Sequence, residues 1–417
     1  MSSIQINGDT SGSVILQAPS VAGSTTVTLP ANSMNMGNGG GNVSTNTALG
    51  YQALNANTTG AQNTAIGWSA LALNTIGTTS TAAGYQSGYT FTGTGSGSSL
   101  TSFGWRSAYS FNPANGASIT AFGLTSAYNT TTGQVVAMGN GALYTNTTGN
   151  SITAIGDSAL YSNTTGSNNT AVGATALFNN TTGQYGVAIG YQAGYSNTTG
   201  TNNTFVGQAA GYSNTTGSYN TFLGNGAANT NSTASNLTAV GYAALGANTT
   251  GSPNDAFGYQ ALYSNTTGNS NVAVGYQSLY TNTIGVENTA VGVQALNKNT
   301  TGAANVAIGA YALINNTTGS FNQAIGDNAL NGVTTGANNI AIGNGAGSSG
   351  TAITTGTGNI IIGHTANAGA AGALNRIVIG AGGVSQGDNT VSIGTGGTNY
   401  IYATVSYTHL TLPTILL

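Results

Sequence analysis

The stretch Asn271-Val272-Ala273-Val274-Gly275-Tyr276-Gln277-Ser278-Leu279-Tyr280-Thr281-Asn282-Thr283-Ile284-Gly285 returns, slightly varied, along most of this chain. Its first glycine, Gly275, directly follows two apolar residues, Ala273 and Val274. A glycine in that place recurs at positions 50, 67, 84, 104, 123 and 139, then at a constant interval of seventeen up to 343, and at 363, 380 and 394. Most gaps in this series of glycines are equal to the first one, from Gly50 to Gly67. A repeat this short cannot bury its own apolar face and has to stack on its neighbours. The period therefore predicts a solenoid.

The residues before each recurring glycine have the pattern of a short strand. With that glycine as position 0, position −1 is apolar in every copy, −3 is mostly Thr or Val, and −2 is usually Ala, as in Thr170-Ala171-Val172. Alternation with β-branching predicts a strand. We expect a second short strand after the glycine, and an outer type I turn at each Asn-Thr-Thr-Gly, such as residues 163–166. The fold class is all-β, a parallel β-roll or β-solenoid of about 21 coils with a seventeen-residue repeat.

The small alanine face of each strand is open to a close neighbour. One coil orders a whole repeat of chain but contributes few large apolar side chains to a core. We therefore expect the alanine faces to meet other copies of the chain, so that a homotrimeric fibre shares one core. Residues 41–397 form the predicted shaft, and residues 1–40 a docking or capping segment that covers the first strand edge. Residues 398–417 form a separate tail.

Charge is almost absent from the 417 residues. Three basic residues stand against six acidic ones, for a net charge of −3: Arg106, Lys298 and Arg376 against Asp9, Asp157, Asp255, Glu287, Asp327 and Asp388. This excludes the basic stripe that nucleic-acid binding requires and a polybasic membrane patch. There is no cysteine, and no apolar run is long enough for membrane insertion.

No catalytic, cofactor or metal constellation is visible. The two histidines, His364 and His409, stand far apart, and Asp157 and Asp327 share a position but lie ten repeats from each other. Paired carboxylates need separations of about 5 to 10 Å. We expect a protein that is not an enzyme and needs no cofactor.

An aromatic residue at +5 is the first candidate for surface binding. Its tyrosines either stack on sugars of a cell surface or stack on one another and seal a seam between chains. They include Tyr109, Tyr128, Tyr144, Tyr161, Tyr195, Tyr212, Tyr263 and Tyr280. The second candidate is Trp105 with Arg106, because the gaps on both sides of Gly104 exceed the regular period and insertions in solenoids often form binding faces.

Two resemblances add to this interpretation. The recurring Asn-x-Ala-Ile-Gly, with Ala at +3, resembles the head repeats of YadA-like trimeric autotransporter adhesins, which implies a trimeric parallel β-roll. That family's repeat is shorter, and its export signal and membrane anchor are not recognisable here. The start of the chain, Ile4-Gln5-Ile6-Asn7-Gly8-Asp9, and the late Thr390-Val391-Ser392-Ile393-Gly394 are similar to bacteriophage tail-fibre proteins. The closing residues 406–414 resemble translated adapter sequence, so we expect a truncated gene with a spurious tail after about residue 405.

The resemblances imply a structural fibre with an adhesive function. A virion tail fibre that binds a host glycan or protein receptor is the first interpretation, and a YadA-like adhesin on a bacterial surface is the alternative. Regularly spaced threonines leave an ice-binding β-solenoid as a third.

Overall fold

A computed structural model describes residues 39–93, 98–112, 116–385 and 387–394, together with three short strands nearer the N-terminus. The fold is all-β, a parallel β-solenoid of about 20 turns with ~17-residue spacing, as the sequence predicts. The chain divides into two compact units, residues 1–254 and 255–417. Most of the predicted docking segment, residues 1–40, and all of the predicted tail, residues 398–417, lie outside the described residues.

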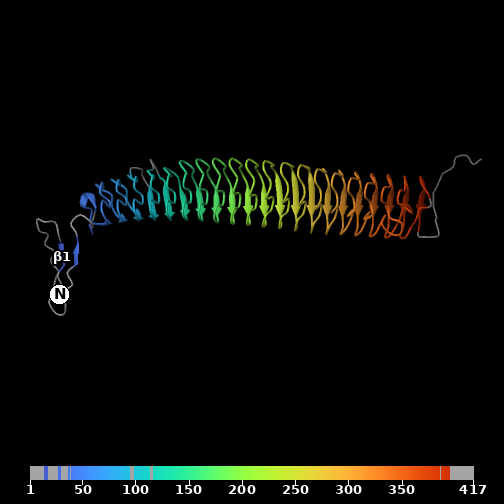
Figure 1. Cartoon of the computed structure of the whole chain (residues 1–417), viewed down its shortest axis with the longest axis horizontal. Coiled ribbons are helices and arrows are strands. Elements are labelled where there is room, and N and C mark those ends of the chain that lie inside the picture. The colour runs from blue at the N-terminus through green and yellow to red at the C-terminus, as the bar shows by residue number, and fades with distance from the viewer. Residues whose placement is uncertain are drawn as a thin grey trace, which may run out of the picture. The chain divides into compact units, whose positions relative to one another are not determined.

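In the first unit each coil contributes one strand to a continuous parallel sheet (Figure 1). The register advances by one repeat, so that Ala154 pairs with Ala171 and Ala171 with Ala188. The longer gaps do not disturb it, since Thr81 pairs with Thr101. The strands are β4 (Thr47–Leu49), β5 (Thr64–Ile66), β6 (Thr81–Ala83), β7 (Ser99–Phe103), β8 (Ser118–Phe122), β9 (Val135–Met138), β10 (Ile152–Ile155), β11 (Thr170–Val172), β12 (Val187–Ile189), β13 (Thr204–Val206), β14 (Thr221–Leu223) and β15 (Leu237–Val240).

Three short strands and one helical turn precede this stack. The strands β1 (Val14–Leu16) and β2 (Val27–Leu29) form an antiparallel pair. The strand β3 (Met36–Gly37) pairs antiparallel with β4, and a 3-10 turn, η1 (Gly40–Asn42), follows it. The backbone of β3 therefore covers the free edge of the first coil.

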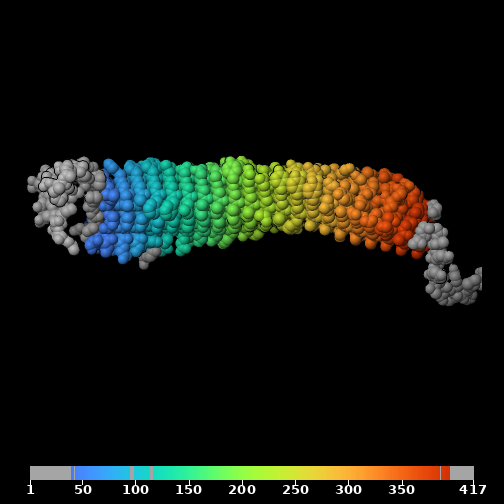
Figure 2. All heavy atoms as spheres, turned by 90° about the horizontal axis from the view of Figure 1, so that it is seen from below, coloured from blue at the N-terminus to red at the C-terminus, as the bar shows by residue number. Residues whose placement is uncertain are grey.

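The second unit has the same construction. Its register also holds across a longer gap, where Ile340 pairs with Ile360. The strand β16 (Asn254–Phe257) stands at the division between the units, and the others are β17 (Asn271–Val274), β18 (Thr289–Val291), β19 (Val306–Ile308), β20 (Gln323–Ile325), β21 (Ile340–Ile342), β22 (Ile360–Ile362), β23 (Ile377–Ile379) and β24 (Val391–Ile393). In both units successive coils pack without gaps on the face in view (Figure 2).

Two features require glycine at position 0: its own backbone conformation and the close approach of the next coil. Gly156 has a φ of +134°, and a Cβ there would lie 2.5 Å from the carbonyl oxygen of Gly173 in the next coil. Only glycine allows both that conformation and that approach. The position-0 glycines therefore set how closely the coils stack.

The orientation of the strands differs from our expectation. The alanines at −2 point into the chain's own interior, where Ala154 and Ala171 have no exposed surface. The larger residues at −1 and −3 point outward, and Ile189 is 43% exposed. The prediction that the alanine faces meet other copies is therefore wrong. The segment that follows the glycine lies opposite the sheet, and its Ala159 and Leu160, at +3 and +4, are also fully buried. The interior of the coil is therefore filled from both sides.

In the coils that the structure describes, no second strand follows the glycine. The segment from +1 to +6 is a series of turns in every regular coil, and residues at +2 and +4, such as Ser158 and Leu160, have φ values of +54° and +52°. Such left-handed residues bend the chain at short intervals and prevent extended pairing. The predicted second strand is therefore wrong, although its alanine and leucine are core residues.

Two internal columns of asparagine run through the coils, and one of them starts each Asn-Thr-Thr-Gly segment, whose two threonines form a bend. Asn163, the first residue of Asn-Thr-Thr-Gly, is fully buried, and its Nδ2 donates to Asn146 Oδ1 at 2.8 Å and to the Gly166 carbonyl at 3.0 Å. In the other column, at −4, Asn322 Nδ2 donates to the carbonyl of Gly336 at 2.9 Å. Hydrogen bonding to a neighbour in an adjacent coil satisfies these buried amides.

Candidate functional site

The aromatic residues at +5 form a stacked column in the first unit. Ring centroids of neighbours lie 5.0 to 5.3 Å apart, with interplanar angles of 4° to 11°. The column consists of Tyr89, Tyr109, Tyr128, Tyr144, Tyr161, Phe178, Tyr195 and Tyr212. In the second unit Tyr263 and Tyr280 stack at 5.4 Å. The structure thus brings together the tyrosines that the sequence singled out, as a column and a separate pair.

The ring faces in this column are occupied by neighbouring rings. Each of these side chains is half-buried, so that mainly ring edges and hydroxyl groups reach the surface. Stacking a sugar on an aromatic residue requires a free ring face. The arrangement therefore matches the second of the two interpretations given above, mutual stacking, while surface binding by these residues stays a prediction.

Crowding of the phenols changes the acidity of one of them. Burial, followed by the neighbouring phenols of Tyr161 and Tyr128, raises the pKa of Tyr144 above its ordinary value of 10.0. A phenolate there would lose hydration and repel charge on either side. Tyr144 is therefore a protonated hydrogen-bond donor at neutral pH.

Trp105 and Arg106 lie in an aromatic cluster. The Arg106 guanidinium carbon is 4.6 Å from the ring centroid of Trp105, 5.4 Å from that of Tyr109 and 5.9 Å from that of Tyr85. Its Nε donates to Gln86 Oε1 at 2.8 Å. These distances are those of cation–π contacts. The cluster places one cation among π faces on a surface that carries almost no other charge.

A line of exposed aromatic residues at +1 joins this cluster, and our sequence interpretation missed it. Tyr51, Trp68, Tyr85 and Trp105 occupy four successive coils and are 39 to 52% exposed. Tyr51 and Trp68 are in contact at 4.5 Å, and Tyr85 and Trp105 stack at 6.2 Å. The signal was available, because both tryptophans of the chain stand at +1.

An apolar line runs along the outer face of the sheet at position −1. In the first unit Ile66, Ile189 and Leu223 are 42, 43 and 46% exposed, and in the second Ile308 and Ile342 are each 40% exposed. We call these position −1 side chains the outer apolar line. A long exposed apolar stripe is typical of an interaction surface.

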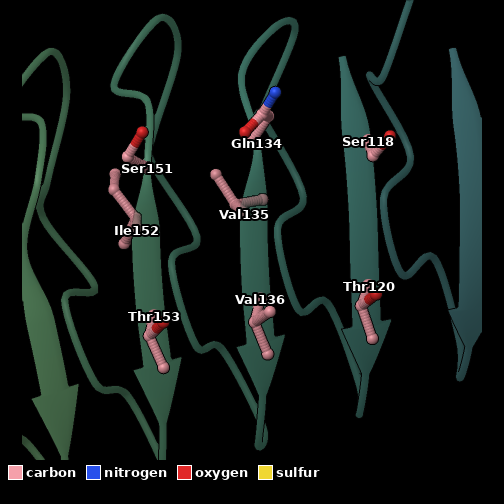
Figure 3. A pocket seen from close by; sticks show the side chains of 8 residues that line it. All are labelled: Ser118, Thr120, Gln134, Val135, Val136, Ser151, Ile152 and Thr153. Carbon is pink, nitrogen blue, oxygen red and sulfur yellow. The ribbon is translucent and has the colours of Figure 1, made fainter. Parts of the chain in front are cut away.

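A shallow hollow of about 450 Å³ opens beside this line at β8, β9 and β10. Figure 3 shows two rows of side chains along it, Ser118, Gln134 and Ser151 in one and Thr120, Val136 and Thr153 in the other. The lining contains hydroxyl and amide groups but no titratable group. Such a surface can form hydrogen bonds but offers no acid–base or electrostatic catalysis.

Within the described part of the chain, no group of three or more His, Cys, Asp or Glu residues could hold a metal ion. The same residues contain no helix that is long and apolar enough to cross a membrane. Compared with known proteins, the chain matches no family model and no curated protein.

Proposed function

We propose that this chain is the shaft of a non-enzymatic structural fibre that mediates adhesion to a host surface. Three copies associate through the outer apolar line, with the alanine side of each strand kept inside its own chain. The observation that supports this most directly is the outer apolar line itself, which continues from strand to strand in both units. Burying such a stripe against other copies removes apolar area from water.

The setting we propose is the tail fibre of a virion that binds a host glycan or protein receptor, consistent with the resemblances at residues 4–9 and 390–394. The alternative is a YadA-like adhesin on a bacterial surface. An antibody against this chain distinguishes the two, because it labels virion tails in the first case and intact bacterial cells in the second.

Light scattering on the full chain tests the association. We expect a mass of three times the 40.9 kDa of one chain. Ile189→Lys places an ammonium group in the outer apolar line and should shift the mass toward that of one chain, since an unpaired buried charge costs several kcal/mol. Tyr185→Lys is the control, because Tyr185 is 56% exposed and lies outside the line. A well-folded unaltered chain with the mass of a monomer would contradict the proposal.

Adhesion is tested separately on the aromatic cluster. A fluorescent form of the chain is applied to a panel of bacterial strains, and the strains that bind it are tested with Trp105→Ala combined with Arg106→Ala. We expect at least about a tenfold loss of binding, as for the loss of aromatic and arginine anchors in other interfaces. Tyr219→Ala is the control, since that ring is 62% exposed elsewhere in the same unit. Unchanged binding by the double variant would remove the cluster from the proposed adhesive surface.

Ice binding remains a second candidate because of one observation. Five successive strands, β4 to β8, present a threonine outward at position −3, and these pair in register: Thr47, Thr64, Thr81, Thr101 and Thr120. Such a row has a repeat of about 4.8 Å. Thermal hysteresis in dilute solution would support this candidate, and its absence would remove it.

A further inference from the structure

The +5 column holds neighbouring tyrosine rings in contact, so that two phenol groups can react with each other after oxidation. Tyr89, Tyr109, Tyr128, Tyr144 and Tyr161 form an uninterrupted run, with centroid separations of 5.0 to 5.2 Å. Phe178 then interrupts the column at 5.3 Å from the ring on each side. Tyr195 and Tyr212 resume it at 5.1 Å. Neighbouring rings therefore touch, whereas Tyr161 and Tyr195 are separated by a ring without a hydroxyl group.

Two further stacked pairs lie in the second unit. Tyr263 and Tyr280 are 5.4 Å apart with an interplanar angle of 10°, and Tyr259 and Tyr276, at position +1, are 5.3 Å apart at 9°. Both pairs join successive coils, and the register of the parallel sheet fixes them in place. Tyr259 and Tyr276 are 44 and 48% exposed, so that a small oxidant can reach them.

Phenols in this arrangement have a defined one-electron chemistry. A one-electron oxidant takes an electron from each of two neighbouring tyrosines, and each phenol releases its hydroxyl proton to water, which leaves two neutral tyrosyl radicals. The radicals join through a new carbon–carbon bond between ring carbons ortho to the hydroxyl groups. Each of those carbons then gives up its hydrogen as a proton that returns to a phenol oxygen. The balance is two tyrosines to one dityrosine, two electrons and two protons.

We propose that the stacked tyrosine column is a site of oxidative dityrosine cross-linking between successive coils of the same chain. The required co-reactant is a one-electron oxidant, such as a peroxidase or a photogenerated metal complex. Each cross-link is a covalent tie between two coils one repeat apart. Because a solenoid opens by separation of adjacent coils, such ties resist its local unfolding.

The geometry favours neighbours in one chain over other partners. The effective concentration of groups held in contact far exceeds that of freely diffusing ones. The rings are also kept parallel by the stacking of the coils, so that the same pairs meet in every molecule. The proposal does not depend on the fibre function or on the number of chains.

The experiment oxidises the full chain with tris(bipyridine)ruthenium, light and persulfate. Dityrosine is followed by its fluorescence, and the cross-linked peptides are identified by mass spectrometry after elastase digestion. We expect neighbouring pairs to exceed all other tyrosine pairs by about tenfold or more. The expected pairs include Tyr144 with Tyr161, Tyr195 with Tyr212, and Tyr263 with Tyr280, and the pair of Tyr161 with Tyr195 is expected to be absent.

Two matched variants make the test specific. Phe178→Tyr completes the column and should add cross-links that join position 178 to Tyr161 and to Tyr195. Tyr280→Phe removes one hydroxyl group and should abolish the cross-link to Tyr263, while the pair of Tyr259 and Tyr276 in the same unit still reacts. Circular dichroism before oxidation verifies that both variants fold.

Mixing unlabelled and ¹⁵N-labelled chains before oxidation separates cross-links within a chain from those between chains. Peptides that carry a single isotope are expected. A majority of mixed-isotope peptides, a random distribution of tyrosine pairs, or no new cross-link in folded Phe178→Tyr would each overturn the proposal.

Discussion

At the scale of single residues, the position-0 glycines carry the strictest requirement in the sequence. We predict that Gly156→Ala lowers the free energy of unfolding by about 2 to 4 kcal/mol, because it combines left-handed strain with a backbone clash. The matched control is Gly226→Ala in the same unit, where φ is +64° but no atom lies within 4 Å of the new Cβ. That change should cost only about 1 kcal/mol. Chemical denaturation measures the unfolding free energy of both variants. Equal losses would show that backbone strain, and not the clash with the next coil, accounts for the cost.

The asparagine columns lead to a second prediction at this scale. Asn197 is buried in mid-column, where its Oδ1 accepts from Asn214 Nδ2 and its Nδ2 donates to Asn180 Oδ1, each at 2.9 Å. Asn316 stands at the end of the column, because the next coil carries Val333, and its Oδ1 is buried with no partner. A column in which every amide donates in one direction ends on an oxygen that accepts nothing from a further asparagine, and at Asn316 no other donor takes that place.

We therefore expect Asn197→Val and Asn316→Val to differ in their effect. The first leaves a new unpaired oxygen on Asn180 and should cost about 1 to 3 kcal/mol of unfolding free energy. The second only moves the unpaired oxygen one coil back, to Asn299, and should cost less than about 1 kcal/mol. The midpoints of chemical denaturation compare them. Equal costs for the two variants would mean that the columns act through packing and not through hydrogen bonds.

At the scale of elements, the internal column at −4 ends in an ion pair. Arg376, 8% exposed, takes the place of asparagine next to β23, and its Nη2 lies 2.6 Å from Asp388 Oδ1. The Leu374 backbone N–H, which donates to Asp388, and then Arg376 lower the pKa of that carboxyl group below its ordinary value of 3.8. Asp388 thus joins the last coil to the one before it.

This pair predicts a pH dependence confined to the end of the second unit. A carboxyl group whose pKa is lower in the folded state stabilises that state above its unfolded pKa, and the contribution is lost as pH falls through the folded pKa. We expect the amide resonance of Leu374 to move below pH 4 in an acid titration followed by NMR. Asp388→Asn should remove that movement and leave the resonances of β18 and β19 unchanged. A Leu374 amide that titrates equally in the variant would contradict this assignment.

The strands show which part of the fold the sequence could predict. The glycine spacing was sufficient to predict the parallel register, because the glycine of each coil has to stack on the glycine of the next coil. The long gaps beside Trp105 did not alter this register. The inward side of the strand was not predictable by hydrophobicity, since in most coils Leu from +4 and asparagine leave room only for Ala at −2. Phe205 and Phe222 are buried at −2 beside Gly194 and Gly211, which stand at +4 in place of Leu. Nor could the pattern reveal left-handed residues such as Leu160, because leucine rarely adopts that conformation.

The candidate site was predictable to a smaller extent. The +5 tyrosines were found from their period, but whether their faces are free depends on how rings in adjacent coils pack, which a period does not contain. Arg106 was noted with Trp105 because both lie between two gaps that exceed the regular period, whereas its contact with Tyr85 follows from a register that spans a long gap. The +1 aromatic line was missed because only some coils carry it.

At the scale of the whole molecule, the near absence of charge sets how the protein responds to salt. One ion pair, Arg376 with Asp388, is found among the described residues, so that screening has little to act on. We predict that the midpoint of thermal unfolding changes by less than about 1 °C between low salt and 1 M NaCl, which corresponds to about 1 kcal/mol or less for a chain of this length. Because the association we propose through the outer apolar line is not electrostatic, the mass in light scattering should also stay constant. Dissociation at high salt would show that charged groups hold the chains together and would remove the outer apolar line as the interface.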